Sequence, residues 1–310
     1  MEFVESKILF MPVLPDLPPA VAHAIVAALA SVVAVAAGVG AWRVRGTTAV
    51  PAAAWAVAAA VNFAGIEAWA ARGGLPEPSA AASARLVAVA LSICPAMSLL
   101  GAKRPQHGVW QVIVASLAVV IAMPAASAAF VRPGALPDVH LLARGFLLVL
   151  AVAGWVNFLG TGRVAAATLL TLGLLLLSRP FLPGVDTAGS LAASWADVIG
   201  AAAAAAGAVA AMLPSKCVAG KDSITKPFIA LRDTIGSAWT LRIAERFNTT
   251  AETRGWPCRL LLDGLSAGGD PDDDAWRPQA RRVFESLMRR FVSRDWLRRH
   301  GGDIAEATRG

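Results

Sequence analysis

Seven apolar runs, each about as long as a bilayer's hydrocarbon core is thick, follow one another in the first 213 residues. A helix needs about 20 mostly apolar residues to cross that core. Backbone polar groups have no water to bond in lipid, so such runs are restricted to helices. The runs lie near 20–42, 50–71, 83–102, 109–131, 141–160, 163–182 and 191–213. We expect an all-α, polytopic membrane protein with about seven transmembrane helices.

The fifth and sixth runs are separated only by Gly160-Thr161-Gly162-Arg163. This short break is typical of a tight helical hairpin, but it also fits one misplaced boundary. A count of six spans therefore stays open. In the last run, Gly200 and Gly207 bracket six alanines, and such a smooth face favours close packing against another helix of the same chain over a homodimer.

Charge divides the chain into two parts. Residues 1–212 hold 8 Asp/Glu and 11 Lys/Arg, whereas residues 213–310 hold 13 and 17. The first part is expected to lie in lipid and the second in water. The predicted division is an extracytoplasmic segment 1–19, a transmembrane bundle 20–213, a juxtamembrane linker 214–226, a helical domain 227–300 and a flexible end 301–310.

The distribution of positive charge predicts the orientation, because Lys and Arg accumulate on the cytoplasmic side. With the N-terminus outside, the inner loops and the start of the tail hold nine Lys/Arg, and the outer segments, in which Arg85 is counted, hold five. The Ala- and Arg-rich composition is typical of a GC-rich bacterial genome. We expect a multi-pass protein of the bacterial inner membrane with its C-terminal domain in the cytosol.

Three ionisable residues fall inside the predicted spans: Glu67, Arg144 and Asp197. Charges at membrane depth are costly and usually face the bundle interior. All three are predicted in the outer half of the bundle, where they form either a structural ion pair or a polar vestibule for a solute or proton. Glu67 alone also fits an interfacial carboxylate. His23 has a weaker claim.

Apolar residues recur every three or four positions from about 227 to 248, which predicts a helix with one buried face. The segment 259–263 is short enough to be a strand. Asp272, Asp273 and Asp274 are placed to cap a second helix that is expected to run to about Arg299. They do not fit an EF-hand, because Gly and Glu are missing at its sixth and twelfth positions.

The second helix is amphipathic and basic, and two arrangements of it compete. Its apolar face packs on the 227–248 helix, or it lies on the inner leaflet with its arginines at anionic headgroups. Candidate contacts with a partner or a membrane surface are Trp239, Trp256, Arg282, Arg289, Arg290 and Trp296. Packing is favoured because both helices carry complementary apolar stripes.

No sequence motif identifies a reaction. HExxH and closely spaced cysteines are absent, so the sequence predicts no metal site and no cofactor, and it favours a non-enzymatic role. Nucleic-acid binding is disfavoured, because no stacking platform accompanies the arginines. The expected function is interaction, assembly or regulation through a protein partner of residues 227–300. The alternative is a small-solute or ion transporter, or a transmembrane sensor, that uses the intramembrane polar residues.

Overall fold

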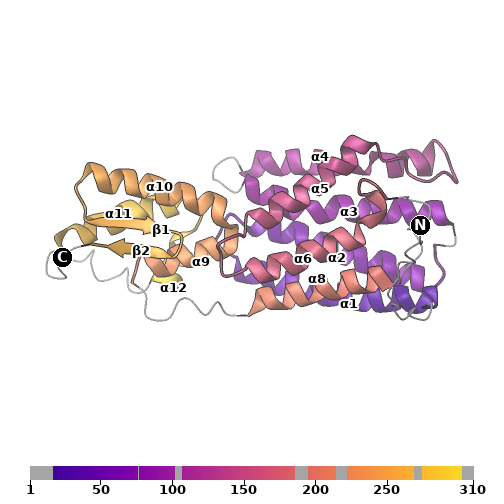
Figure 1. The fold of residues 1–310 in the computed structure, drawn as a ribbon, viewed down its shortest axis with the longest axis horizontal. Coiled ribbons are helices and arrows are strands. Elements are labelled where there is room, and N and C mark those ends of the chain that lie inside the picture. The colour runs from indigo at the N-terminus through magenta and orange to yellow at the C-terminus, as the bar shows by residue number, and fades with distance from the viewer. Residues whose placement is uncertain are drawn as a thin grey trace, which may run out of the picture.

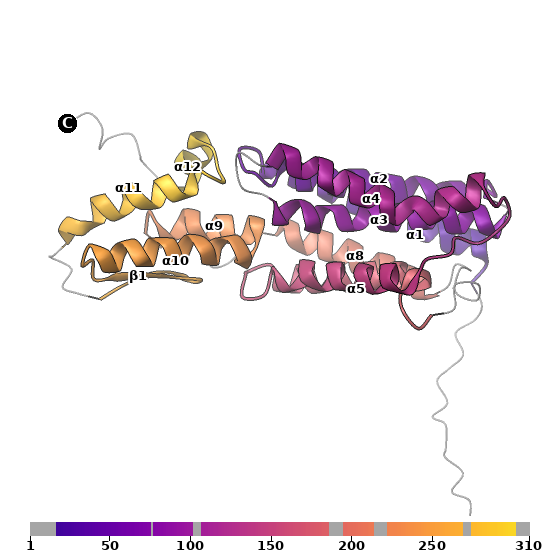
Figure 2. The same ribbon diagram turned by 90° about the horizontal axis from the view of Figure 1, so that it is seen from above.

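The computed structural model of the chain describes residues 17–75, 77–101, 107–185, 195–213, 222–268 and 274–301. Within these ranges it contains eleven α-helices and one two-stranded sheet. A long helical bundle and a smaller C-terminal domain lie end to end (Figures 1 and 2). We call the end of the bundle next to the domain the domain end, and the opposite end the distal end.

Five helices of the bundle are long and apolar enough to cross a membrane. They are α1 (Pro19–Arg43), α2 (Val50–Ala71), α3 (Pro78–Leu100), α4 (His107–Phe130) and α8 (Trp195–Met212). Two further apolar helices in the bundle are shorter, α5 (Leu141–Val156) and α6 (Val164–Leu177), and a 3₁₀ turn η1 (Arg179–Phe181) follows α6. The predicted helical fold is confirmed, and the five long apolar helices are consistent with a multi-pass membrane protein.

Glycines bring α6 and α8 into close contact. A Cβ at Gly173 would lie 2.6 Å from the carbonyl oxygen of Gly200, and one at Gly207 would lie 2.8 Å from the backbone nitrogen of Leu170. Small residues permit this approach where lipid provides no hydrophobic drive for helix association. The smooth face predicted at Gly200 and Gly207 therefore packs within the chain, as expected.

The C-terminal domain combines four helices with a hairpin. Its elements are α9 (Thr225–Ile235), α10 (Ser237–Thr253), β1 (Cys258–Leu261), β2 (Gly264–Ala267), η2 (Asp274–Trp276), α11 (Arg277–Met288) and α12 (Arg294–Gly301). β1 and β2 pair antiparallel, which confirms a strand in the segment predicted at 259–263. Phe284 meets both Phe228 and Phe247 at ring-centroid distances of 6.4 Å. These rings form the centre of the domain core.

The amphipathic helix packs internally. Phe284 is 1% exposed and Met288 is fully buried, and both belong to the same core as α9 and α10. Of the two arrangements that the sequence left open, packing is the one found. The domain is therefore built around its own aromatic core, with the apolar face of α11 turned inward.

Two predicted helices are each divided in the structure. The 227–248 helix breaks at Gly236, whose φ of +88° ends α9 and starts α10. The helix expected to reach Arg299 breaks between α11 and α12, where residues 289–293 turn toward the bundle. Both predictions of a single helix were wrong, because backbone contacts with the bundle replace helical hydrogen bonds there. Asp272, Asp273 and the linker residues 214–221 lie outside the described residues.

Candidate functional site

Four charged or titratable side chains meet inside the distal half of the bundle. Nε of Arg85 donates to Oε1 of Glu67 at 3.2 Å, and Nη1 of Arg85 lies 3.8 Å from Oδ2 of Asp197. Nδ1 of His23 lies 2.6 Å from Oε2 of Glu67, within hydrogen-bond distance. The four residues come from α3, α2, α8 and α1, so the cluster links four helices.

Burial makes the pairing in this cluster essential. Glu67 is fully buried, Asp197 is 1% exposed and Arg85 is 5% exposed. The formal charges of the two carboxylates and the one guanidinium sum to one negative charge. The His23 side chain is 18% exposed and is the member of the cluster with the most access to the surroundings. His23 is therefore the side chain through which the surroundings have most access to the cluster.

Of the three predicted intramembrane residues, Glu67 and Asp197 both contact one guanidinium, and Arg144 lies in a different group. The Arg144 Nε donates to the carbonyl of Val139 at 2.9 Å, and its Nη1 donates to that of Val185 at 3.0 Å. It therefore ties the start of α5 to the segment after η1. The structure brings two of the three candidates together through Arg85 and leaves the third apart.

Sequence reasoning missed the central residue of the cluster. Arg85 was counted with the outer segments, because the third span was expected to start near residue 83. The helix instead starts at Pro78, which places Arg85 two turns inside it. Pro78 was the available signal, because proline is favoured in the first turn of a helix. His23, which had only a weak claim, lies one turn inside α1 and pairs with Glu67.

The C-terminal domain docks directly on the loops at the domain end of the bundle. In the loop between α1 and α2, Thr47 forms an antiparallel bridge with Val292. The backbone N–H of Thr48 donates to the carbonyl of Phe291 at 2.8 Å, and that of Ser293 donates to the carbonyl of Gly46 at 2.7 Å. Backbone pairing of this kind fixes the register as well as the position of the two segments.

The loop after α5 forms a second contact with the domain. The Asn157 side chain donates to the carbonyl of Ile235 at 2.9 Å and accepts from the N–H of Ala238 at 3.1 Å. The Asn157 carbonyl accepts from the N–H of Ser237 at 2.6 Å. Nε1 of Trp239 donates to the carbonyl of Leu99 at 2.9 Å, which ties the end of α3 to α10. Two loops of the bundle and the end of α3 therefore bind one domain.

Two arginines at the domain end cap α8. Nη1 of Arg43 donates to the carbonyl of Met212 at 2.6 Å, and Nη1 of Arg163 donates to that of Leu213 at 2.6 Å. Helix C-termini carry unpaired carbonyls and a partial negative charge, which cationic side chains stabilise. Both arginines were predicted in inner loops, and the structure gives them this additional structural role.

The predicted surface contacts of the domain divide into two groups. Arg282, Arg289 and Arg290 are exposed. Trp296 is 2% exposed and stacks on His300 at 4.0 Å between ring centroids, so it belongs to the core. Trp256 is half-buried and faces the ring of Phe247. Trp239 lies at the contact with the bundle, so the three tryptophans do not share an exposed groove.

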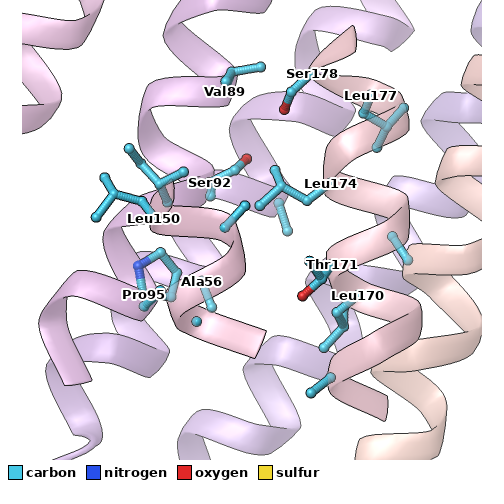
Figure 3. A pocket seen from close by; sticks show the side chains of 18 of the residues that line it. Ala56, Val89, Ser92, Pro95, Leu150, Leu170, Thr171, Leu174, Leu177 and Ser178 are labelled. Atoms are coloured by element: carbon cyan, nitrogen blue, oxygen red, sulfur yellow. The ribbon is translucent and has the colours of Figure 1, made fainter. Parts of the chain in front are cut away.

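An apolar cavity of about 310 Å³ lies within the bundle, mainly between α3, α5 and α6 (Figure 3). Its lining extends along α3 from Val89 to Leu100 and along α6 from Ala167 to Ser178. The cavity does not include Glu67, Arg85 or Asp197 among its lining residues.

No group of three His, Cys, Asp or Glu side chains in the described part of the chain is arranged to hold a metal ion. Comparisons with protein-family models, with curated proteins and with solved structures give no match. The functional argument therefore depends on the geometry of this chain alone.

Proposed function

We propose that the protein is a multi-pass membrane protein with an interaction, assembly or regulatory role, in which the C-terminal domain binds a protein partner from the cytosol. The observation that carries the proposal is the docking of this domain on two loops of the bundle and the end of α3 through backbone and side-chain hydrogen bonds. A partner bound to such a domain is held at a fixed position against the membrane part.

The exposed arginines of the domain are the surface that we assign to this partner. Arg282, Arg289 and Arg290 remain exposed although the apolar face of α11 is used internally. Interfaces are enriched in arginine, which presents several donors in one plane. The partner surface is accordingly expected to be acidic.

The proposed topology has seven spans, with the N-terminus outside and the C-terminus in the cytosol of a bacterial cell. α5 and α6 are shorter than a full span. At their distal ends, η1 and the segments bound by Arg144 extend this pair of helices. Their connecting loop reaches the domain through Asn157, and Gly162 donates its N–H to Asp233 of α9 at 3.1 Å. Arg43, Arg45 and Arg163 lie at the domain end, in agreement with a cytoplasmic location for it.

Transport or sensing is the second candidate. The cluster of His23, Glu67, Arg85 and Asp197 favours it, because buried charges in a membrane often mark an ion or proton path. Two observations weigh against it. The carboxylates pair with Arg85, and the apolar cavity does not reach them. The pairing supports a structural role in helix assembly better than a path through the bundle.

The decisive experiment is in-membrane crosslinking followed by mild-detergent purification and mass spectrometry of the full chain. A triple variant, Arg282→Ala with Arg289→Ala and Arg290→Ala, is compared with the wild type. Removing the domain is a poorer test, because the two loops and the end of α3 would lose their hydrogen-bond partners. We expect the wild type to retain one stoichiometric partner and the variant to lose it.

A matched control removes the same charge from another exposed part of the domain. Arg246→Ala with Arg254→Ala and Arg259→Ala takes three exposed arginines from α10, the following turn and β1. This control should retain the partner. Equal loss in both variants would indicate a general charge effect and contradict the assigned surface, and the absence of any partner from the wild type would contradict the proposed function.

A further inference from the structure

The apolar cavity of the bundle contains one buried polar atom whose hydrogen-bonding capacity is unused. Ser178 is 3% exposed, and its Oγ has no hydrogen-bond partner in the described structure. Ser178 lines the cavity at the distal end of α6, and Figure 3 shows its oxygen directed toward the space between α3 and α6. Buried hydroxyls are rarely left unpaired. The site is thus an apolar slot with one hydroxyl at its end.

The shape of the cavity indicates the kind of ligand that fits it. The lined part of α3, from Val89 to Leu100, spans twelve residues, and the eleven steps between them at 1.5 Å each give about 16 Å. Half of a hydrocarbon core about 30 Å thick has nearly the same length. A volume of about 310 Å³ is roughly twice that of the engineered apolar cavity that takes up benzene. Both dimensions suit one hydrocarbon chain.

We propose that this cavity binds one fatty acyl chain, with the hydroxyl of Ser178 donating to the carbonyl oxygen at the head of that chain. The bilayer around a multi-pass helical protein supplies such chains at high concentration. Arg144 bonds to backbone carbonyls of Leu182 and Val185 just beyond η1, so polar groups gather at the level where the carbonyl would lie. The chain extends from there toward Leu100 and Phe158 at the domain end.

This site goes beyond the proposed partner function and is independent of it. The lining consists mainly of alanine, leucine and valine side chains, which match a saturated chain. Ser92, the other serine of the lining, donates to the carbonyl of Ala88 at 2.7 Å and is satisfied within α3. Ser178 is therefore the group that discriminates an acyl carbonyl from a plain hydrocarbon.

The test uses the full chain in membranes and a palmitic acid that carries a photoactivatable diazirine on its chain. After illumination, mass spectrometry assigns the modified residues. We expect modification to concentrate on cavity residues such as Leu150, Thr171 and Leu174. Equal modification of the exposed residues Val149, Val152 and Leu172 on the same helices would overturn the proposal, because it would indicate only the general lipid surface.

A pair of variants on one helix sharpens the test. Ala167 lines the cavity and Ala165 is exposed two residues earlier. Ala167→Phe should reduce modification of cavity residues at least fivefold, and Ala165→Phe should leave it unchanged. Persistence of wild-type modification in Ala167→Phe would overturn the proposal. If Ala167→Phe does not insert, the wild-type map decides alone.

Ser178→Ala tests the assigned hydrogen bond. One hydrogen bond contributes about a fivefold change in affinity, so the variant should require about five times more labelled fatty acid for half-maximal modification. An unchanged requirement would overturn the role of Ser178. Lipid extraction of the purified wild type shows whether the acyl chain belongs to a glycerophospholipid or to a free fatty acid. About one of either lipid per protein supports the site. If neither lipid exceeds its level in Ala167→Phe, the result contradicts the site.

Discussion

The guanidinium of Arg85 binds the carboxylate of Glu67 at 3.2 Å inside the bundle, where Glu67 is fully buried. Removing one member of a buried pair leaves an uncompensated charge. Arg85→Ala is therefore expected to destabilise the folded bundle by about 3–5 kcal/mol. The change in stability is measured by heating the purified protein in detergent and using aggregation to monitor its thermal unfolding.

Two comparisons separate this effect from a general loss of an arginine. Arg72 is exposed near the end of α2, and Arg72→Ala should change stability by at most about 0.5 kcal/mol. Arg85→Lys should fall between the two, because an ammonium cannot contact Glu67 and Asp197 with a planar fork. Equal stability of all three variants would show that the cluster does not hold the helices together.

Gly236 is predicted to be irreplaceable at the turn between α9 and α10. Its φ is +88°, and a Cβ there would overlap the side chain of Asn157. Gly236→Ala should cost about 3 kcal/mol through backbone strain and overlap together. Gly255→Ala is the control, because φ is +65° but nothing lies within 4 Å of the added Cβ; it should cost about 1 kcal/mol. The free energies of unfolding of the two variants should differ by about 2 kcal/mol. Equal losses of stability would show that the added Cβ at residue 236 does not clash with Asn157.

The docking of the domain can be trapped chemically. Thr47 and Val292 are antiparallel bridge partners, and Cα atoms in such pairs lie about 4.5–5.5 Å apart, within the range that a disulfide spans. In a chain without its native cysteines, Thr47→Cys with Val292→Cys should crosslink under mild oxidation. The pair Thr47→Cys with Arg259→Cys, on β1, should not. Crosslinking is read as a mobility shift that disappears on reduction, and its absence in the first pair would contradict the docked arrangement.

The thiol of Cys258 is expected to react slowly. Burial raises its pKa above the ordinary thiol value, and the positive charge of Arg277 offsets part of that effect. A raised pKa means less thiolate at a given pH, so alkylation at pH 8 should be slower than that of a cysteine in an unstructured peptide. The rate should keep rising with pH above the point where the peptide levels off. The rate of alkylation by iodoacetamide is measured against pH in a chain without Cys94 and Cys217. A pH profile equal to that of the peptide cysteine would show that the Cys258 thiol is accessible and would contradict the prediction.

The sequence predicted the bundle well, because long apolar runs are a direct consequence of the solvent. The limits of α2 at Val50 and Ala71 coincide with the predicted run, whereas α5 ends four residues early at Val156. It ends there because Asn157 bonds to the domain, a contact between residues 80 positions apart that no local pattern reveals. Hydrophobic periodicity likewise identified the apolar faces of the helices in the C-terminal domain, but it did not predict where these helices break, at Gly236 and at residues 289–293.

The charged cluster was predicted only in part for a related reason. Glu67 and Asp197 were recognisable as charges inside apolar runs, but their shared partner depends on which helices are neighbours. Arg85 was assigned to the outer segments by a boundary error of five residues at Pro78. The cavity was not predictable at all, since it is a gap left by the packing of α3, α5 and α6.

The docked domain also has a consequence for the order of folding. Arg45 accepts a hydrogen bond from Arg299, 254 positions later, and Leu99 accepts one from Trp239, 140 positions later. Contacts between such distant positions form slowly, because a long loop must close before they stabilise the chain. During synthesis the loop between α1 and α2 must wait until α12 has been made. The docked arrangement therefore forms only after residue Arg299 has been made.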